Sequence, residues 1–332
     1  MKIGIIGSGK FGLVLARIAV ENGNEVSIYS RRQDEVDSLN QHKKSISGLS
    51  FEDHEITATS DPLELNQCEA LFITVASKDF REVINKINYK SQKGKFISCA
   101  KGFDINTGKL MSEVLTDDFN INSSNVFVLS GPNLSKELHN KELTGTVIAG
   151  EDSEFIESLC KALKTKYFIP FTNNDRYGVE LGGALKNIYA ILSGYFHKKG
   201  VGENTIGLLL TKCLSEMSEY SKARGANPST FLGLAGVGDF FSTALSHDSR
   251  NYKFGEFLAQ NKSPEEALEL VGDTVEGYAT SLTVRKNAKD LGVNLKLLNY
   301  LISIYEKSKT LDEDKEIFQS LEIEPDINFE FN

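Results

Sequence analysis

The sequence lacks the patterns that mark secreted, metal-binding and membrane-spanning proteins. Its four cysteines, Cys68, Cys99, Cys160 and Cys213, are scattered and form no Cys-x-x-Cys pair, which favours reduced thiols over a disulfide framework. The five histidines have no metal-ligand spacing, so we expect no zinc site. No apolar run approaches the roughly 18–20 residues of a bilayer span. A strand pattern begins at Lys2 and leaves no room for a signal peptide, so we expect a cytoplasmic protein.

Positive charge is also in short supply. The chain has 37 Lys and Arg residues against 46 Asp and Glu, a formal net charge of −9. Such a surface repels phosphate backbones and anionic membranes, so nucleic acid is not an expected partner. A small anionic substrate would therefore need a local cationic pocket. The length of 332 residues and the 40% hydrophobic content are sufficient for two folded domains.

The two parts of the chain have different periodicity. Residues 1–172 alternate short runs rich in Val, Ile and Phe with helical stretches, which predicts a doubly wound, mostly parallel α/β domain. Residues 173–332 carry helical patterns, broken at 233–238 and 272–277, and predict an all-α domain. The expected strands are Ile3–Ile6, Val26–Tyr29, Leu71–Val75, Phe96–Ser98, Val126–Leu129 and Thr146–Ala149, and the expected helices of the first domain include Phe11–Asn22, Phe80–Ile87 and Phe155–Leu163.

A glycine-rich turn follows the first expected strand. The stretch Gly7-Ser8-Gly9-Lys10-Phe11-Gly12 has the G-x-G-x-x-G pattern and opens an amphipathic helix. Two glycines allow a tight turn and close approach to a pyrophosphate, the third lets the helix pack on the strand, and the helix N-terminus offers N–H donors. This position in the chain predicts a dinucleotide site in a Rossmann-type domain.

The end of the second expected strand bears on the choice of cofactor. NAD-specific proteins usually place Asp or Glu there to bind the ribose 2′-hydroxyl. This chain has Tyr29-Ser30-Arg31-Arg32 instead. Arg31 and Arg32 could bind a 2′-phosphate, which favours NADP(H) with NAD(H) tolerated. Alternatively, the two arginines begin a solvated helix.

Lys186 lies in an unusual helical segment, Val179–Ile191. Leu181, Leu185 and Ile188 form a buried stripe, whereas the neighbours of Lys186 on its own face are Gly182, Gly183 and Ala190. Glycines inside a helix cost roughly 1 kcal/mol each relative to alanine, so they need a reason. One explanation is that they allow close helix packing while Lys186 extends to solvent. The other is that they line the bottom of a cavity in which the partly desolvated amine of Lys186 acts as general acid and base.

Further polar loops favour the second interpretation. Lys101 follows a strand of the first domain, at the strand end where α/β sheets bind ligands. In the second domain, Asp239 ends a glycine-rich loop, and Ser249-Arg250-Asn251 offers several donors to a phosphate. Together with a nucleotide-binding turn, these loops predict an anionic, phosphorylated carbonyl substrate.

With these motifs, the chain resembles the bacterial NAD(P)-dependent glycerol-3-phosphate dehydrogenases over nearly its whole length. The resemblance rests on seven motifs in the family's order: Gly7–Gly12, Ala100-Lys101-Gly102, Ser130-Gly131-Pro132, Val179–Ile188, Gly233–Asp239, Ser249-Arg250-Asn251 and Val275-Glu276-Gly277.

The resemblance implies a role for each matching residue. Lys186 looks like the family's catalytic proton donor and acceptor, and Asp239 like the acid that sets its electrostatics. The implied substrate-binding residues are Lys101, Gly131, Asn133, Asn187, Asp239, Thr243, Ser249, Arg250 and Asn251. The implied cofactor-binding residues are Gly7, Ser8, Gly9, Lys10, Phe11, Gly12, Arg31, Arg32, Lys101, Ser135, Arg250, Thr274 and Glu276.

Several positions depart from the family pattern. Phe11 stands where the family usually has Trp, and Asn133 and Ser135 replace the usual Ser and Ala. Lys212 replaces an arginine, which removes a bidentate fork but keeps the charge. The loop from about Gln41 to Ile56 is shorter than usual, so the resemblance implies no adenosine contact for its residues.

The implied activity is the reversible NAD(P)H-dependent reduction of dihydroxyacetone phosphate to sn-glycerol 3-phosphate, a product that the family supplies to glycerophospholipid synthesis, carried out by a homodimer. One alternative is a β-hydroxyacid dehydrogenase or ketopantoate-type reductase, which gives no reason for Ser249-Arg250-Asn251. Another is a nucleotide-sensing regulator without catalysis, which would not need the substrate loops.

Overall fold

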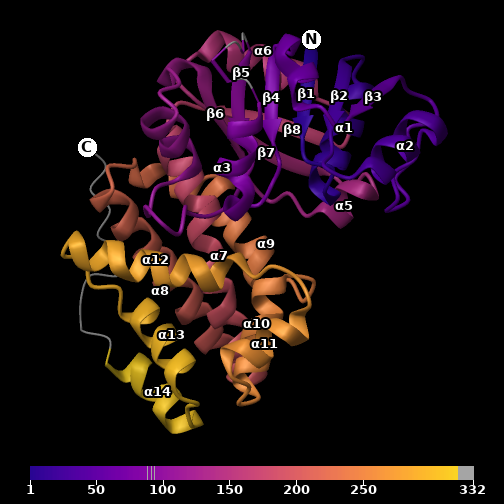
Figure 1. The fold of residues 1–332 in the computed structure, drawn as a ribbon. Coiled ribbons are helices and arrows are strands. Elements are labelled where there is room, and N and C mark those ends of the chain that lie inside the picture. The colour runs from indigo at the N-terminus through magenta and orange to yellow at the C-terminus, as the bar shows by residue number, and fades with distance from the viewer. Residues whose placement is uncertain (88, 91, 93, 321–332) are drawn as a thin grey trace. The chain divides into compact units, whose positions relative to one another are not determined.

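The computed structural model describes residues 1–87, 89, 90, 92 and 94–320. Residues 321–332, the end of the predicted helical domain, lie outside this description. The chain divides into two compact units (Figure 1). The first comprises Met1–Asp104 and Lys109–Glu180, and the second comprises Ile105–Gly108 and Leu181–Asn332. The division in the second half of the chain therefore falls within one helix, α7 (Arg176–Lys198).

The first unit is built on one eight-stranded sheet with the order β3-β2-β1-β4-β5-β6-β7-β8. Neighbouring strands are parallel except β6 and β7, which are antiparallel. The strands are β1 (Lys2–Ile6), β2 (Glu25–Tyr29), β3 (Ile56–Thr59), β4 (Ala70–Ile73), β5 (Lys95–Ser98), β6 (Val126–Ser130), β7 (Thr144–Ala149) and β8 (Phe168–Asn173). The order reverses between β1 and β4, and such a switch point is where doubly wound sheets bind nucleotides. The predicted Rossmann-type fold is confirmed.

All six predicted strands are present, and two further strands, β3 and β8, were not predicted. Both are edge strands. β8 contains Pro170 and exposes much of its length, and β3 has two threonines among its four residues, Ile56–Thr59. Proline and polar residues are tolerated at an edge because one side of the strand needs no hydrogen bonds. Edge strands therefore lack the continuous apolar run that identifies the central ones.

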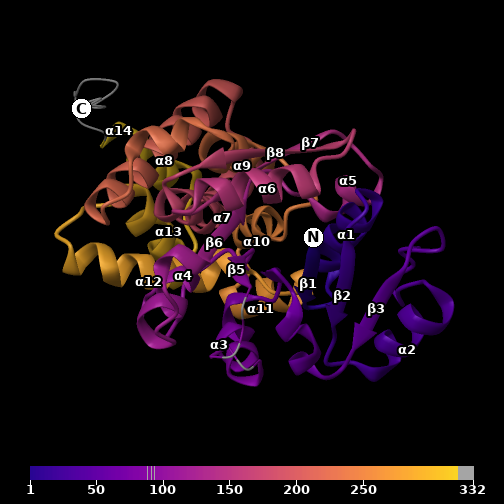
Figure 2. The ribbon, with the colours of Figure 1, turned by 90° about the horizontal axis from the view of Figure 1, so that it is seen from above.

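Helices cover both faces of the sheet. Alternate residues of a strand point to opposite faces, so Ile5, Phe72 and Ile97 pack in one core and Ile6, Ile73 and Phe96 in another. Figure 2 shows α3 and α6 on opposite sides of β5. The helices of this unit are α1 (Lys10–Glu21), α2 (Gln33–His42), α3 (Ser77–Lys86), α4 (Met111–Glu113), α5 (Ser135–His139) and α6 (Ser153–Leu163), with short turns η1 (Pro62–Gln67), η2 (Val114–Asp118) and η3 (Ser123–Asn125).

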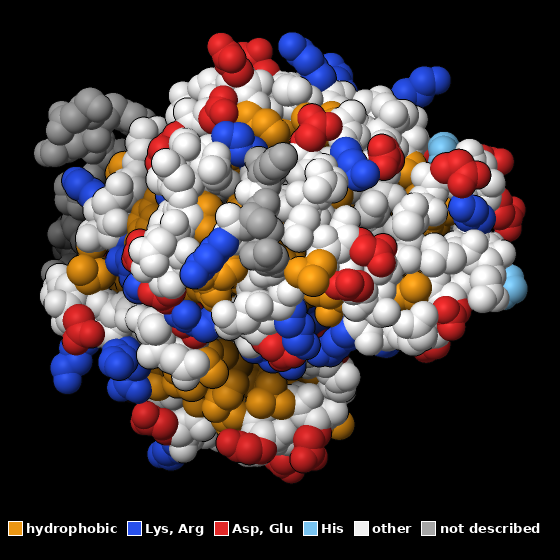
Figure 3. Space-filling view, turned by 45° about the horizontal axis from the view of Figure 1, so that its top comes forward, with side chains coloured by type: hydrophobic (Ala, Val, Ile, Leu, Met, Phe, Trp, Pro, Cys, Tyr) orange, Lys and Arg blue, Asp and Glu red, His pale blue; other side chains and the backbone are white. Residues whose placement is uncertain are grey.

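The second unit is helical, as predicted. Its elements after α7 are α8 (Glu203–Ala223), η4 (Pro228–Leu232), η5 (Leu234–Gly238), α9 (Asp239–Ala244), α10 (Arg250–Ala259), α11 (Pro264–Val271), α12 (Glu276–Asp290), α13 (Lys296–Glu306) and α14 (Leu311–Gln319). Within the described ranges, none of the helices combines the length and hydrophobicity of a membrane span. Figure 3 shows acidic and basic side chains interspersed over one face of the molecule.

Candidate functional site

The glycine turn after β1 has the geometry that a dinucleotide requires. Gly7 has φ +111°, a conformation that favours glycine. A Cβ on Gly12 would lie 2.2 Å from the carbonyl oxygen of Gly7, so only glycine lets α1 approach the strand this closely. A Cβ on Gly9 would meet nothing within 4 Å, and no side chain caps the first turn of α1 at Gly9. The turn thus leaves an open space in front of helix N–H donors, which suits a pyrophosphate.

Two hydroxyl contacts hold this turn, and sequence reasoning missed both. Thr74, at the end of β4, donates to the carbonyl oxygens of Ile6 and Gly7 at 2.9 and 3.1 Å. The hydroxyls of Ser8 and Ser30 lie 2.7 Å apart and join the turn to the end of β2. Ser30 is next to Arg31 in sequence, but nothing in the spacing of Ser8 and Ser30 indicates that they touch.

Arg31 and Arg32 have different surroundings. Arg31 is exposed at the end of β2. Arg32 is the residue before α2, and its guanidinium donates to Oε2 of the fully buried Glu35 at 2.6 Å. The same Glu35 oxygen accepts from the backbone N–H of Ile46 at 3.2 Å, in the shortened 41–56 loop. Arg32, although its side chain is half exposed, therefore supports the local fold through this ion pair, and Arg31 is exposed as well.

The loops after β5 and β6 are joined by Lys101. Its amine donates to the carbonyl oxygen of Gly131 at 3.0 Å. Asn133 donates its amide to the Thr146 hydroxyl at 3.0 Å, and its own carbonyl oxygen is buried and accepts no hydrogen bond among the described residues. Lys101, Gly131 and Asn133 therefore lie in one group at the carboxyl ends of these strands. Ser135 begins α5 just beyond them.

Lys186 is buried in the second unit, with only 5% of its surface exposed. Its amine donates to the carboxylate of Asp239, which is fully buried, and to the hydroxyl of Thr243 at 2.7 Å. A buried lysine needs such partners because an unpaired ammonium is costly to desolvate. The possibility that Lys186 extends to solvent is therefore wrong, and three residues of the predicted site are in direct contact.

The glycines beside Lys186 were expected to floor a hollow, and at Gly182 the structure shows close packing instead. A Cβ on Gly182 would lie 2.3 Å from the carbonyl oxygen of Ala235, in η5. The missing side chain lets η5 approach α7, and η5 leads directly into Asp239 at the start of α9. Gly182 thus contributes to the environment of Lys186 indirectly. Because it has no side chain, η5 can pack against α7, and η5 leads to the carboxylate of Asp239.

Asn187 lies in a second buried network. It accepts a hydrogen bond at 3.0 Å from Asn251, whose own oxygen accepts from the N–H of Gly277 at 2.9 Å. Asn187 also donates to Glu276 at 3.4 Å. This network ties α7 to the first residues of α10 and α12, which are far apart in sequence. It brings together the predicted residues Asn187, Asn251 and Glu276.

The expected phosphate-binding segment is only partly open. The Ser249 hydroxyl accepts from the N–H of Tyr252 at 3.3 Å and so caps α10, and Asn251 is turned toward Asn187. Arg250 is half exposed and forms an ion pair with Asp273 at 2.9 Å, next to Thr274. Arg250 is therefore the residue of this segment that solvent and solutes can reach most easily.

Two further carboxyl groups are buried at α7. Glu180 belongs to this helix, and Glu216 contacts Tyr189 of the helix. Glu180 accepts the N–H of Ser112 at 3.0 Å and the Ser112 hydroxyl, and burial raises its pKa to about 7. Glu216 accepts the N–H of Leu297 at 2.6 Å and the Tyr189 hydroxyl at 3.0 Å, and burial likewise raises its pKa to about 7. Neither group was singled out from the sequence.

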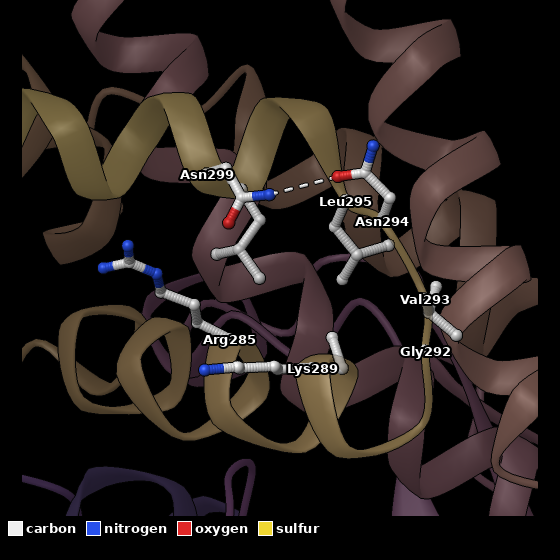
Figure 4. Close-up of a pocket in the computed structure, with 9 residues that line it drawn as sticks. Arg285, Lys289, Gly292, Val293, Asn294, Leu295 and Asn299 are labelled. Atoms are coloured by element: carbon white, nitrogen blue, oxygen red, sulfur yellow. Dashed lines mark hydrogen bonds between the residues drawn. The ribbon is translucent and has the colours of Figure 1, made fainter.

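A surface pocket of about 340 Å³ lies at the turn between α12 and α13. Arg285 and Lys289 extend from one helix, with Asn294 and Asn299 across from them (Figure 4). Arg285 is also paired with Glu306 at 3.7 Å. None of the residues predicted for catalysis lines this pocket, so it is not the candidate active site.

Known proteins match this chain over nearly its whole length. The sequence models described as the N-terminus and the C-terminus of NAD-dependent glycerol-3-phosphate dehydrogenase match residues 2–156 and 175–315. The chain is 36% identical to the NAD(P)+ glycerol-3-phosphate dehydrogenase of Pseudomonas fluorescens (strain SBW25), over 98% of this chain and 96% of that protein. It is 39% identical to the corresponding protein of Alcanivorax borkumensis, with the same coverage. The crystal structure of glycerol-3-phosphate dehydrogenase from Coxiella burnetii is similar with a TM-score of 0.83 and 28% identity, over 96% of this chain and 98% of that one.

Proposed function

Because this chain belongs to the NAD-dependent glycerol-3-phosphate dehydrogenase family, we propose that it reduces dihydroxyacetone phosphate reversibly to sn-glycerol 3-phosphate, a precursor of glycerophospholipids. The observation that carries the proposal is the buried contact of Lys186 with Asp239 and Thr243. An amine held in this way is suited to general acid and base chemistry.

Each step of the reaction would depend on particular residues of the chain. Bound NAD(P)H supplies the hydride for the carbonyl carbon. Lys186 donates a proton from Nζ to the carbonyl oxygen and, in the reverse direction, accepts the hydroxyl proton. Asp239 stabilises the ammonium form of Lys186, and Lys101 adds positive charge that favours an alkoxide.

Arg250 would bind the substrate's phosphate. Its guanidinium offers paired N–H donors that match phosphate oxygens, and it is half exposed beside Asp273. The phosphate would compete with Asp273 for these donors. Binding energy from this non-reacting end would orient the carbonyl group, with Asn187 and Asn251 fixing the neighbouring backbone.

The first unit fits the dinucleotide. The open space at Gly9 and the uncapped start of α1 provide room and N–H donors for the pyrophosphate. Thr274 and Glu276, in the second unit, are further cofactor contacts that the family resemblance implies. We infer a preference for NADPH because Arg31 is exposed at the end of β2 and no acid stands there.

The decisive experiment is an initial-rate assay of dihydroxyacetone phosphate reduction, followed at the nicotinamide absorbance with NADH and NADPH side by side. We expect turnover with both and a higher kcat/KM with NADPH. Arg31→Ala should lower kcat/KM with NADPH about tenfold, and that with NADH by much less, because one charged hydrogen bond to the 2′-phosphate is lost. Equal losses with both cofactors would contradict the role of Arg31 and leave the reaction itself intact.

A hydroxyacid substrate is the alternative. A β-hydroxyacid dehydrogenase or ketopantoate-type reductase would explain the glycine turn and Lys186, but it would have no use for Arg250. A panel of phosphate-free hydroxyacids and ketopantoate should be inert with this protein. Turnover of these compounds at rates above that of dihydroxyacetone phosphate would replace the proposed reaction.

Two broader expectations belong with this proposal. The four free cysteines, three of them buried, fit a reducing compartment such as the cytoplasm. A homodimer is what the family resemblance implies. Light scattering coupled to size-exclusion chromatography tests the dimer directly.

A further inference from the structure

The short helix α9 carries two of the three groups in the lysine cluster. Asp239 is its first residue and Thr243 its fifth, and both accept hydrogen bonds from Lys186. A helix of six residues has almost no stability of its own. The positions of Asp239 and Thr243 around the amine must therefore be fixed by what α9 packs against.

Ser193 makes the contact that holds the end of α9. Its hydroxyl donates to the carbonyl oxygen of Ala244, the last residue of α9, at 2.6 Å, and both residues are fully buried. The last carbonyls of a helix have no partner within the helix. Ser193 supplies one from α7, directly beside Thr243.

The spacing on α7 makes this contact relevant to Lys186. Ser193 follows Lys186 by seven residues, which is two helical turns, so the two side chains lie on the same face about 10 Å apart along the axis. Helix α9 is thus attached to one face of α7 at two places. Lys186 contacts Asp239 and Thr243, and Ser193 contacts Ala244.

The neighbouring histidine need not compete for the Ser193 hydroxyl proton. Nδ1 of His197 lies 3.0 Å from the Ser193 carbonyl oxygen and 3.4 Å from its hydroxyl. The carbonyl can only accept, and the hydroxyl has a single proton, which it gives to Ala244. With the proton on Nδ1, the ring donates to the Ser193 carbonyl and leaves the hydroxyl proton of Ser193 directed at α9. A serine inside a helix is also a poorer helix former than alanine, so this contact provides a reason for its presence.

We propose that Ser193 is a positioning residue for the reaction, which holds α9 so that Asp239 and Thr243 stay in hydrogen-bonding distance of Lys186. The inference rests on the proposed function. Without the Ser193 hydroxyl, the end of α9 is released from α7, the ammonium form of Lys186 is less well stabilised, and proton transfer is slower. Ser193 is fully buried in the second unit, so we expect its loss to act through α9 and to change kcat more than either KM.

The test compares Ser193→Ala and Ser193→Cys with a matched control, Ser281→Ala. Ser281 is also fully buried, and its hydroxyl donates to a carbonyl at 2.6 Å, but that carbonyl belongs to Tyr278 of its own helix, α12. Ser193→Ala should lower kcat about tenfold, with a smaller change in either KM, as expected when general acid catalysis is weakened but not abolished. Ser193→Cys should fall between wild type and Ser193→Ala, because a thiol is a weaker donor of similar size. Ser281→Ala should keep the wild-type kcat even if its melting temperature falls equally.

The pH profile separates positioning from general loss of structure. In the reduction direction Lys186 must be protonated, so kcat falls at alkaline pH. In Ser193→Ala this alkaline limb should move to lower pH, because the ammonium has lost support, whereas in Ser281→Ala it should not move. An unchanged kcat and pH limb in Ser193→Ala, with wild type active on dihydroxyacetone phosphate, would overturn the inference and leave the proposed function standing. An inactive wild type would instead refute the proposed function. If Ser193→Ala does not fold, the kcat and alkaline limb of Ser193→Cys decide in the same way.

Discussion

The two units present their functional groups in opposite ways. In the first unit, the glycine turn leaves open space at Gly9, since a Cβ there would meet no atom of the described residues within 4 Å and no side chain among them caps α1. In the second unit, the polar groups are buried and bonded to one another, as Lys186, Asp239 and Asn187 are all at most 5% exposed. The first arrangement suits backbone recognition of a large cofactor. The buried arrangement suits a catalytic side chain whose protonation and position must be controlled.

This contrast predicts different sensitivities to mutation. A site made by backbone geometry depends on the glycines that permit it, and most side chains nearby can vary. A site made by a buried network depends on every member, because removing one leaves another polar group unsatisfied. The substitutions below test this difference, beginning with the largest expected effect.

Lys186→Ala should lower kcat by about 10²- to 10⁴-fold, the usual contribution of a general acid. NADPH binding should change little, because Lys186 is not among the residues proposed to contact the cofactor. Steady-state kinetics gives the first quantity and the fluorescence of bound NADPH the second. Activity within tenfold of wild type would remove Lys186 from its proposed role.

Lys186→Ala needs a control because it leaves the carboxylate of Asp239 buried without the lysine amine. Breaking a buried ion pair in this way lowers the stability of the folded protein by about 3–5 kcal/mol. The double variant Lys186→Met, Asp239→Asn removes both charges and should recover most of that stability. It should remain inactive. Recovery of activity together with stability would mean that the single variant had failed through unfolding.

Gly12→Ala and Gly9→Ala should separate fold from binding in the first unit. A Cβ at Gly12 would lie 2.2 Å from the Gly7 carbonyl oxygen and 2.5 Å from the Thr74 hydroxyl, so this variant should lose about 1–3 kcal/mol of stability, as overpacked sites do, and bind NADPH weakly. Gly9→Ala has open space around it and should change stability by no more than about 1 kcal/mol. Its NADPH affinity should still fall by at least tenfold, because the methyl group would occupy space that the pyrophosphate needs.

Thermal denaturation and NADPH titration of the two glycine variants measure these quantities. Equal stability losses would show that the glycine turn is as tightly packed at Gly9 as at Gly12. Unchanged NADPH binding by Gly9→Ala would move the pyrophosphate away from this turn. Either result would weaken the contrast between the two units.

In the first unit, the sequence predicted the central strands of the sheet better than its two edges. The strands β1, β4, β5 and β6 have continuous apolar runs and were expected, whereas the edge strands β3 and β8 were not. At the functional sites, the glycine turn could be predicted because its physical requirement is local in sequence. The Arg32–Glu35 ion pair is local too, at a spacing of three residues, and it could have been found by pairing charges along the helix.

The contacts that the sequence could not predict join residues that are far apart. Asn187 and Asn251 are separated by 64 positions, and Lys186 and Asp239 by 53. Their contact depends on the path of the intervening helices, which no spacing rule encodes. The family resemblance implied that Lys186 and Asp239 act together. The resemblance did not indicate that η5 packs closely against α7 at Gly182, or that Ser193 donates a hydrogen bond to the end of α9.

The smallest expected effect concerns Glu180, whose pKa of about 7 in the folded protein exceeds its ordinary value of 4.5 because the carboxyl group is buried. Between these two pH values the folded protein binds a proton that the unfolded chain has released, so this group makes stability decrease as pH rises from about 4.5 to 7 and contributes no further change above that range. In Glu180→Gln, the amide can accept from the Ser112 N–H and donate to its hydroxyl, so the local contacts are kept and the titration is removed. The variant should therefore match wild type near pH 4.5 and exceed it at pH 8 by up to about 3 kcal/mol, as measured by urea denaturation at both pH values. A variant that is less stable than wild type at pH 8 would mean that the first unit favours the carboxylate form of Glu180, and that this unit too contains a buried charge stabilised by its hydrogen-bond partners.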